Sequence, residues 1–217
     1  MIINTDNFII HLKNLKCISL MSFLSGSCKN TFENNIMYGS GSFALYHHCG
    51  LENVSKNNII HRTSSSSDHA LNQAVGGCEK TSTAGLYQSY TNSHNIYYLD
   101  NAKDFALGRD WDRFYDPLRP NDTVIFHHNL YYSAARTDDL HLMKFPGGTK
   151  QNPWIWSQWV SPDSGQDEYS KWANPKFSDP YSNKYELAED SPALELGIKQ
   201  INLDNFGIQK SQSDKDF

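Results

Sequence analysis

The densest group of acidic and aromatic side chains is Arg109-Asp110-Trp111-Asp112-Arg113. In a strand, side chains alternate between two faces, so Asp110 and Asp112 would share one face and Trp111 would lie opposite. Glycoside hydrolysis requires two carboxyl groups that flank the scissile bond, and an indole stacks on the apolar face of a sugar. The spacing predicts Asp110 and Asp112 as a catalytic acid and base, with Trp111 and Arg109 as substrate contacts. A solvated loop in which the arginines pair with the aspartates is the alternative.

Three further side chains could supply an acid or a base. Asp138 is followed by a second aspartate, and because adjacent strand residues face opposite ways, at most one of the two reaches a given site. His48 titrates near neutrality and shares a strand face with Tyr46, which we assign to substrate binding. Glu52 lies beside a glycine turn. The alternatives are structural: an aspartate turn, a histidine hydrogen-bonded within the fold, and an acceptor for backbone amides.

Four of the five tryptophans lie between residues 154 and 172. As strand residues, Trp154 and Trp156 would share one face, and their flat rings suit the C–H surface of a sugar or of another protein. We therefore predict them as substrate-binding residues. The alternative is that these rings cover a side of the fold.

The sequence predicts no metal centre and no cofactor. Its four cysteines form no CxxC pair and have no histidine at zinc-finger spacing, and they allow three disulfide pairings among which the sequence does not choose. His94, His127 and His128 lie at or next to repeated asparagines, and we expect them to stack as turn residues. Oxygen-rich loops could bind calcium, but no residues specify such a site.

An internal repeat gives the main indication of fold. Its aligned asparagines are separated by 23, 37 and 34 residues, which fits a unit of 23 with two insertions. Each asparagine precedes a short run with strand preference, so the pattern predicts stacked coils in which asparagine amides bond from coil to coil. We expect the aliphatic residue after each asparagine to point inward; chance recurrence in an Asn-rich chain is the alternative. The repeats are 34–38 (NNIMY), 57–61 (NNIIH), 94–98 (HNIYY) and 128–132 (HNLYY).

The pattern changes after the fourth repeat. Residues 174–177 (NPKF) and 190–198 (DSPALELGI) follow the tryptophan-rich segment and lack the asparagine repeat. A stack of coils exposes the backbone edge of its last coil, which some terminal element has to cover. We expect these residues to form that C-terminal cap.

Several of these stretches carry a family resemblance. The run 46–59 (YHHCGLENVSKNNI) combines histidine, Gly-x-Glu-Asn and Asn-Asn-Ile, with Cys49 in place of an aromatic, and 126–132 (FHHNLYY) is a second such strand. Together with the C-terminal motifs, they resemble the right-handed parallel β-helix repeat proteins, particularly the secreted group related to polysaccharide-degrading enzymes. Residues 166–170 (QDEYS) lie where that group often has Asp-x-His-Ser, so the histidine is absent.

The resemblance implies an all-β fold, a right-handed parallel β-helix (solenoid) of about four coils with a decorated C-terminal cap. The chain looks like the C-terminal portion of a larger protein. We divide it into an N-terminal segment, 1–30, that is either a partial coil or a degenerate signal, the β-helix with its cap, 31–207, and a polar tail, 208–217. The group includes glycoside hydrolases, polysaccharide lyases, epimerases and proteins with no known activity, so the fold alone does not name the reaction.

Composition restricts the partners. A chain of 217 residues with net charge −5 and scattered basic residues lacks the footprint of a nucleic-acid binder, and the charges between residues 8 and 24 exclude a membrane span there. Two glycosylation sequons favour an extracellular location. We expect a monomer whose partner is a polysaccharide or other glycan. Hydrolysis by a carboxylate pair is the first hypothesis, preferred to lyase chemistry; a non-catalytic glycan-binding or structural solenoid, or an enzyme remnant, is the alternative.

Overall fold

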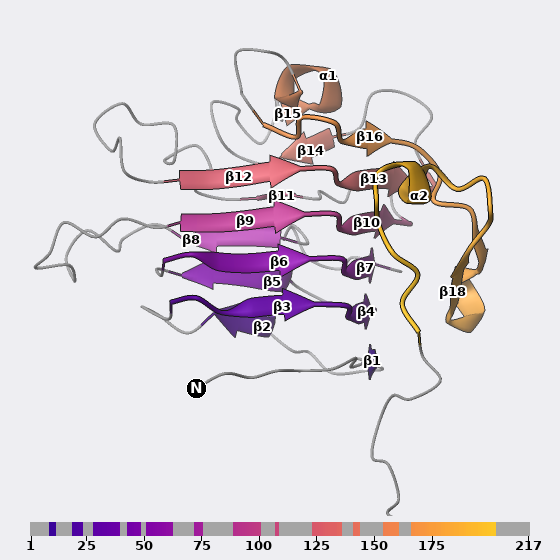
Figure 1. Ribbon diagram of the computed structural model, residues 1–217, viewed down its shortest axis with the longest axis horizontal. Coiled ribbons are helices and arrows are strands. Elements are labelled where there is room, and N and C mark those ends of the chain that lie inside the picture. The colour runs from indigo at the N-terminus through magenta and orange to yellow at the C-terminus, as the bar shows by residue number, and fades with distance from the viewer. Residues whose placement is uncertain are drawn as a thin grey trace, which may run out of the picture.

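The secondary structure described in this computed structural model is almost entirely short β-strands (Figure 1). The all-β class and the parallel pairing expected from the sequence are both confirmed. Among the residues described, no helix is long and apolar enough to cross a membrane. The structure describes residues 9–11, 19–23, 28–39, 43–48, 51–62, 72–75, 89–100, 107–108, 123–135, 141–143, 154–160 and 166–202.

The strands form three main sheets, in which every pairing is parallel except that of β15 with β14. Sheet A contains β1 (Ile9–His11), β4 (Ile36–Tyr38), β7 (Ile59–Arg62), β10 (Ile96–Leu99), β13 (Leu130–Ser133) and β16 (Lys171–Trp172). Sheet B contains β2 (Ser19–Phe23), β5 (Phe43–His48), β8 (Asn72–Val75), β11 (Leu107–Gly108), β14 (His141–Met143) and β15 (Trp154–Ile155). Sheet C contains β3 (Thr31–Glu33), β6 (Asn53–Lys56), β9 (Ser89–Ser93) and β12 (Thr123–His127).

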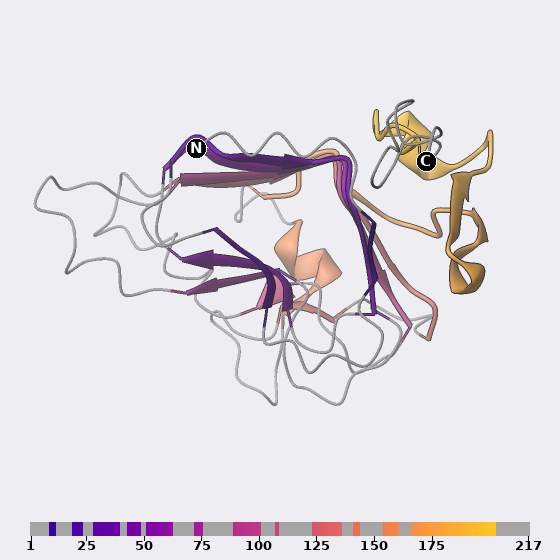
Figure 2. The same ribbon diagram turned by 90° about the horizontal axis from the view of Figure 1, so that it is seen from below.

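The chain visits the three sheets in turn. From β3 to β14 it passes from sheet C to sheet A to sheet B and then pairs each new strand with the strand three earlier. Viewed along the stack, the sheets lie on three sides of a shared interior (Figure 2). Strands β1 and β2, from the segment that the sequence left as either a partial coil or a signal, pair with β4 and β5.

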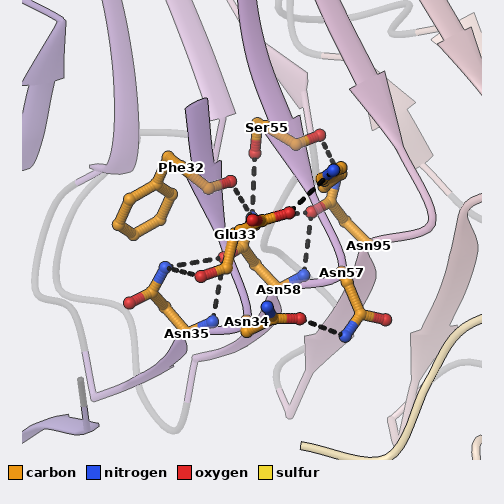
Figure 3. Close-up of polar contacts among 9 residues, drawn as sticks. Phe32, Glu33, Asn34, Asn35, Ser55, Asn57, Asn58 and Asn95 are labelled. Atoms are coloured by element: carbon orange, nitrogen blue, oxygen red, sulfur yellow. Dashed lines mark hydrogen bonds and ion pairs between the residues drawn. The ribbon is translucent and has the colours of Figure 1, made fainter. Parts of the chain in front are cut away.

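The repeated asparagines lie at the corner between sheets C and A (Figure 3). Each side-chain oxygen accepts two bonds from the preceding asparagine: Asn58 Oδ1 from the backbone N and Nδ2 of Asn35 at 3.1 Å, and Asn95 Oδ1 from those of Asn58 at 3.1 and 3.0 Å. Asn129 Oδ1 accepts from Asn95 in the same way. The predicted asparagine ladder is confirmed, and it fixes the register of β4, β7, β10 and β13.

Sheet A buries both of its faces, and this overturns one expectation. The aliphatic residue after each ladder asparagine was expected to point inward. Instead, this row packs outside the sheet, while the next residue in each strand joins the interior core, as alternation requires. The outward row is Ile36, Ile59, Ile96 and Leu130, and the inward row is Met37, Ile60, Tyr97 and Tyr131.

The C-terminal segment, residues 174–202, lies along the outer face of sheet A (Figures 1 and 2). It contains β17 (Phe177–Asp179), the short 3-10 helix η3 (Pro180–Ser182), β18 (Lys184–Leu187) and α2 (Pro192–Glu195). Its apolar side chains, including Leu196 and Ile198, pack on the outward aliphatic row, and Lys199 donates its backbone N–H to Asn57 Oδ1 at 2.7 Å. The segment therefore covers a sheet face, whereas the sequence pattern had predicted that it covers the end of the stack.

A different element occupies the end of the stack. Helix α1 (Trp156–Trp159) lies beyond β12 and β13 and over the interior (Figures 1 and 2). Trp159 is fully buried, with its ring 5.7 Å from that of Phe126, and the Trp156 ring lies 5.3 Å from that of Tyr131. Burial of these indoles removes a large apolar area from water, which explains why this end needs no further sheet.

Candidate functional site

Sheet C presents an open outer face. Among the described residues, none of the elements lies over it (Figure 2), and Ile125 is 43% exposed there. Alternation sends Phe32, Ser55, Asn92 and Phe126 inward and leaves two outward rows in register across the sheet. The first row is Thr31, Val54, Thr91 and Ile125.

The second outward row of sheet C is polar and charged. Glu33 and Lys56 are adjacent, with Oε2 and Nζ 2.8 Å apart, and the backbone of Glu168 continues the row beyond His127. With His127 neutral, the row contains two carboxylates and one ammonium, so it has no strong excess of positive charge. Its members are Glu33, Lys56, Ser93, His127 and Glu168.

One edge of this open face is a column of side chains at the corner to sheet A. Each member has a left-handed backbone, with φ between 50° and 62°, a conformation in which Asn and His are enriched. Four members directly precede a ladder asparagine, and Tyr169 precedes Ser170, whose Oγ accepts from the backbone N of Asn129 at 2.7 Å. Asn57 Nδ2 donates to Asn34 Oδ1 at 2.8 Å, and further along the column the rings of His94 and His128 stack. The column is Asn34, Asn57, His94, His128 and Tyr169.

Three histidine rings meet in this column and beside it. The His94 and His128 rings are stacked, 5.1 Å apart at 14°, and Tyr169 covers the other side of His128 at 5.0 Å. His127 Nδ1 lies 2.9 Å from His128 Nδ1, with the two rings nearly perpendicular. Burial, reinforced by the nearby His128, lowers the pKa of both His94 and His127; Lys56 also lowers the His94 pKa, while Asp167 and Glu168 partly oppose the shift at His127.

These shifts predict acid sensitivity. When a histidine pKa is lower in the folded state, the folded chain binds fewer protons than the unfolded chain below the unfolded pKa of about 6.5, so stability falls as the pH drops through that range. We expect the urea concentration at the midpoint of unfolding, measured in buffer with EDTA, to decrease as the pH is lowered from about 7.5 to 5. His94→Asn installs asparagine, the residue that Asn57 provides at the equivalent position of the column. This variant should show a smaller change of the unfolding midpoint with pH. Equal pH slopes for His94→Asn and the unchanged protein would contradict this assignment.

Asp167 ends the asparagine ladder. Its fully buried carboxylate accepts from Asn129 Nδ2 at 3.0 Å and Ser170 Oγ at 2.6 Å on Oδ1, and from Tyr131 Oη at 2.7 Å and Trp159 Nε1 at 2.5 Å on Oδ2. Burial raises the pKa of the Asp167 carboxyl, and the four hydrogen bonds oppose that shift. Because four donors from the protein converge on the Asp167 carboxylate, this side chain ends the series of ladder hydrogen bonds, and its role is structural.

His61 has a similar structural role on the opposite face of sheet A. The ring is buried, with Nδ1 2.9 Å from Tyr185 Oη and Nε2 3.1 Å from Asp100 Oδ1. Tyr38 and Tyr98 contact it edge-on at 5.1 and 4.5 Å. Because both ring nitrogens are engaged, the histidine joins the C-terminal segment to the sheet and leaves no nitrogen for a substrate.

Most residues selected from the sequence are not brought into one described site. The backbones of Tyr46 and His48 lie in β5 and that of Trp154 in β15, but their side chains fall outside the described part. Glu52 is exposed at a bend, 3.8 Å from Lys29, and its backbone N–H donates to Ser89 Oγ, not to a ligand site. The residues whose positions lie wholly outside the described residues are Arg109, Asp110, Trp111, Asp112 and Asp138.

The tryptophan prediction needs one correction. Trp156 does not continue the strand that contains Trp154; it begins α1 and packs against the interior core. A strand turning into a helix over the end of the stack redirects the second indole, so the two residues do not form the expected row on one strand. The described ring of Trp156 supports the alternative, in which it covers part of the fold.

Sequence reasoning missed the open face of sheet C. Its signal was present, because Glu33, Lys56, Ser93 and His127 each lie two residues before a ladder asparagine and therefore share one face. Comparison of the chain with protein-family models, with curated proteins and with solved structures finds no match.

Proposed function

We propose that the protein is a right-handed parallel β-helix that binds a neutral polysaccharide along the open face of sheet C. Three parallel sheets visited in strict rotation, with an asparagine ladder at one corner, support the β-helix architecture. Parallel strands joined by crossovers are right-handed in about 98% of cases, which supports the handedness.

The two outward rows of sheet C support binding of an extended chain. Thr91 lies between Val54 and Ile125, so hydroxyl and apolar groups alternate at the strand spacing of about 4.8 Å. The adjacent row offers carboxylate acceptors and an ammonium donor, which suit the hydroxyl groups of a sugar. Mixed charges, together with the net charge of −5, favour a neutral glycan over a polyanion.

The described face supports binding more than cleavage. Its outward carboxylates, Glu33 and Glu168, stand at opposite ends of one row, four strand spacings or about 19 Å apart. Glycosidases hold their two carboxyl groups about 5 to 9.5 Å apart. Hydrolysis by Asp110 and Asp112 stays a prediction of the sequence, and we propose glycan binding as the function of sheet C.

A blocking substitution tests this proposal. Thr91→Arg places a long cation in the middle of the open face, and Leu194→Arg makes the same charge change on α2, where Leu194 is 41% exposed. We expect affinity electrophoresis through gels containing a neutral glucan to show retardation that Thr91→Arg weakens by at least about tenfold, or 1.4 kcal/mol. Gels containing a polyuronate should give no retardation.

The control separates binding at sheet C from other surfaces. Leu194→Arg, compared with its own migration in a gel without glycan, should be retarded as strongly as the unchanged protein, since α2 lies on the outer side of sheet A. Equal retardation of both variants would place the glycan elsewhere. Retardation by the polyuronate alone would refute the neutral ligand.

A further inference from the structure

We propose that His127 and His128 form a two-imidazole binding site for a divalent transition-metal ion, with Cu²⁺ as the best-fitting ion. The proposal does not depend on glycan binding, since it rests on the two ring nitrogens and their immediate surroundings. Both rings are half-buried at the corner between sheets C and A and keep access to solvent.

The separation of the ring nitrogens selects the coordination angle. His127 Nδ1 and His128 Nδ1 are 2.9 Å apart, and the rings are at 89°. An ion about 2.05 Å from each nitrogen, the usual distance for imidazole ligands, would make an N–metal–N angle of about 90°. That is the angle between neighbouring ligands in the tetragonal geometry of Cu²⁺ and Ni²⁺, and it is narrower than the tetrahedral angle that Zn²⁺ prefers. Of these ions, Cu²⁺ binds nitrogen sites most strongly.

The surroundings hold one ligand in place. The His128 ring lies between the rings of His94 and Tyr169, at 5.1 and 5.0 Å, and its left-handed backbone turns it toward His127. Ligands fixed by their neighbours lose little freedom when a metal binds.

His94 is not part of this ligand set. An imidazole binds a metal in the plane of its ring, and the His94 and His128 rings are stacked with only 14° between their planes, so one ion cannot lie in both planes. Consistent with this, no group of three or more His, Cys, Asp or Glu side chains within the described residues is arranged to hold a metal. The two histidines therefore leave the remaining coordination positions to water or a small ligand.

Replacements drawn from the chain's own coils test the site with little risk to the fold. His128→Asn and His94→Asn each install the residue type that Asn57 has at the same corner, and His127→Ser installs that of Ser93. Titration with Cu²⁺, followed by electron paramagnetic resonance, should show a tetragonal site with two nitrogen couplings. We expect His127→Ser and His128→Asn to weaken binding by at least about tenfold, since losing a group that merely supports a ligand already costs 10–100-fold.

His94→Asn serves as the matched control, because it should keep the two-nitrogen signal. Circular dichroism on each variant verifies the fold, and histidines elsewhere contribute equally to all the titrations. The proposal is overturned if the two-nitrogen signal persists in either His127→Ser or His128→Asn, or if the unchanged protein never shows it.

Discussion

Replacing Asp167 with Asn is expected to lower the free energy of unfolding by about 2 to 3 kcal/mol, the cost of leaving a buried hydrogen-bond donor without its acceptor. The substitution keeps the size and shape of the side chain. It removes one acceptor atom from a site where Asn129, Ser170, Tyr131 and Trp159 all direct donors. A carboxylate only accepts, whereas an amide brings two N–H donors of its own.

Neither orientation of an amide at position 167 fits. If its NH₂ group replaces Oδ1, it meets the amide NH₂ of Asn129; if it replaces Oδ2, it meets the indole N–H of Trp159. Neither neighbour can become an acceptor, although the hydroxyl groups of Ser170 and Tyr131 can rotate. In either orientation, two buried N–H donors therefore face each other with no acceptor between them.

Urea unfolding followed by circular dichroism measures the effect. Glu168→Gln makes the same acid-to-amide change one residue further on, at an exposed side chain, and should stay within about 0.5 kcal/mol of the unchanged protein. An Asp167→Asn variant with an unaltered unfolding midpoint would show that the four donors do not depend on the carboxylate.

The sequence predicted the parts of the fold that repeat the same local chemistry. The ladder asparagines were aligned despite spacings of 23, 37 and 34 residues, because insertions between coils leave the turn unchanged. Asp167 was missed as the end of the ladder, since its residue type differs from that of the repeat. The prediction that the aliphatic row containing Ile59 points inward was wrong. Strand alternation separates the two faces but does not tell which of them a distant segment will cover.

The candidate site was less predictable than the fold. Within the part of the chain that the structure describes, no element covers the outer face of sheet C, and a sequence pattern does not contain that information. The contact between His127 and His128 depends on a left-handed backbone at His128, which turns two adjacent side chains toward each other although strand alternation would separate them. The sequence instead predicted a site at Asp110 and Asp112 beside Trp111, because carboxylates next to an indole are residue types with a known role in sugar chemistry.

The ladder also has a direction, and this gives the second large effect. Each asparagine accepts from the coil before it and donates to the coil after it. Asn95 shows both roles: its Oδ1 accepts from Asn58, and its Nδ2 donates to Ser55 O at 3.0 Å and to Asn129 Oδ1 at 3.3 Å. The bonds between ladder side chains therefore all run toward Asp167, where an acceptor-only group ends the series. Each amide also donates back to a backbone carbonyl of an earlier strand, as Asn95 does to Ser55 O.

Asn95→Asp is accordingly expected to lower the free energy of unfolding by about 3 kcal/mol or more, since it turns a buried donor into an acceptor that faces two other acceptors. Asn34→Asp is the matched control. Its Oδ1 accepts from Asn57 at the half-buried corner, so a carboxylate keeps that bond and the change should cost less than about 1 kcal/mol. Urea unfolding of both variants checks the difference. Equal losses would contradict the hydrogen-bond argument; a large loss for Asn95→Asp beside a small one for Asn34→Asp would support the view that an acid is tolerated only where the ladder needs an acceptor, as at Asp167.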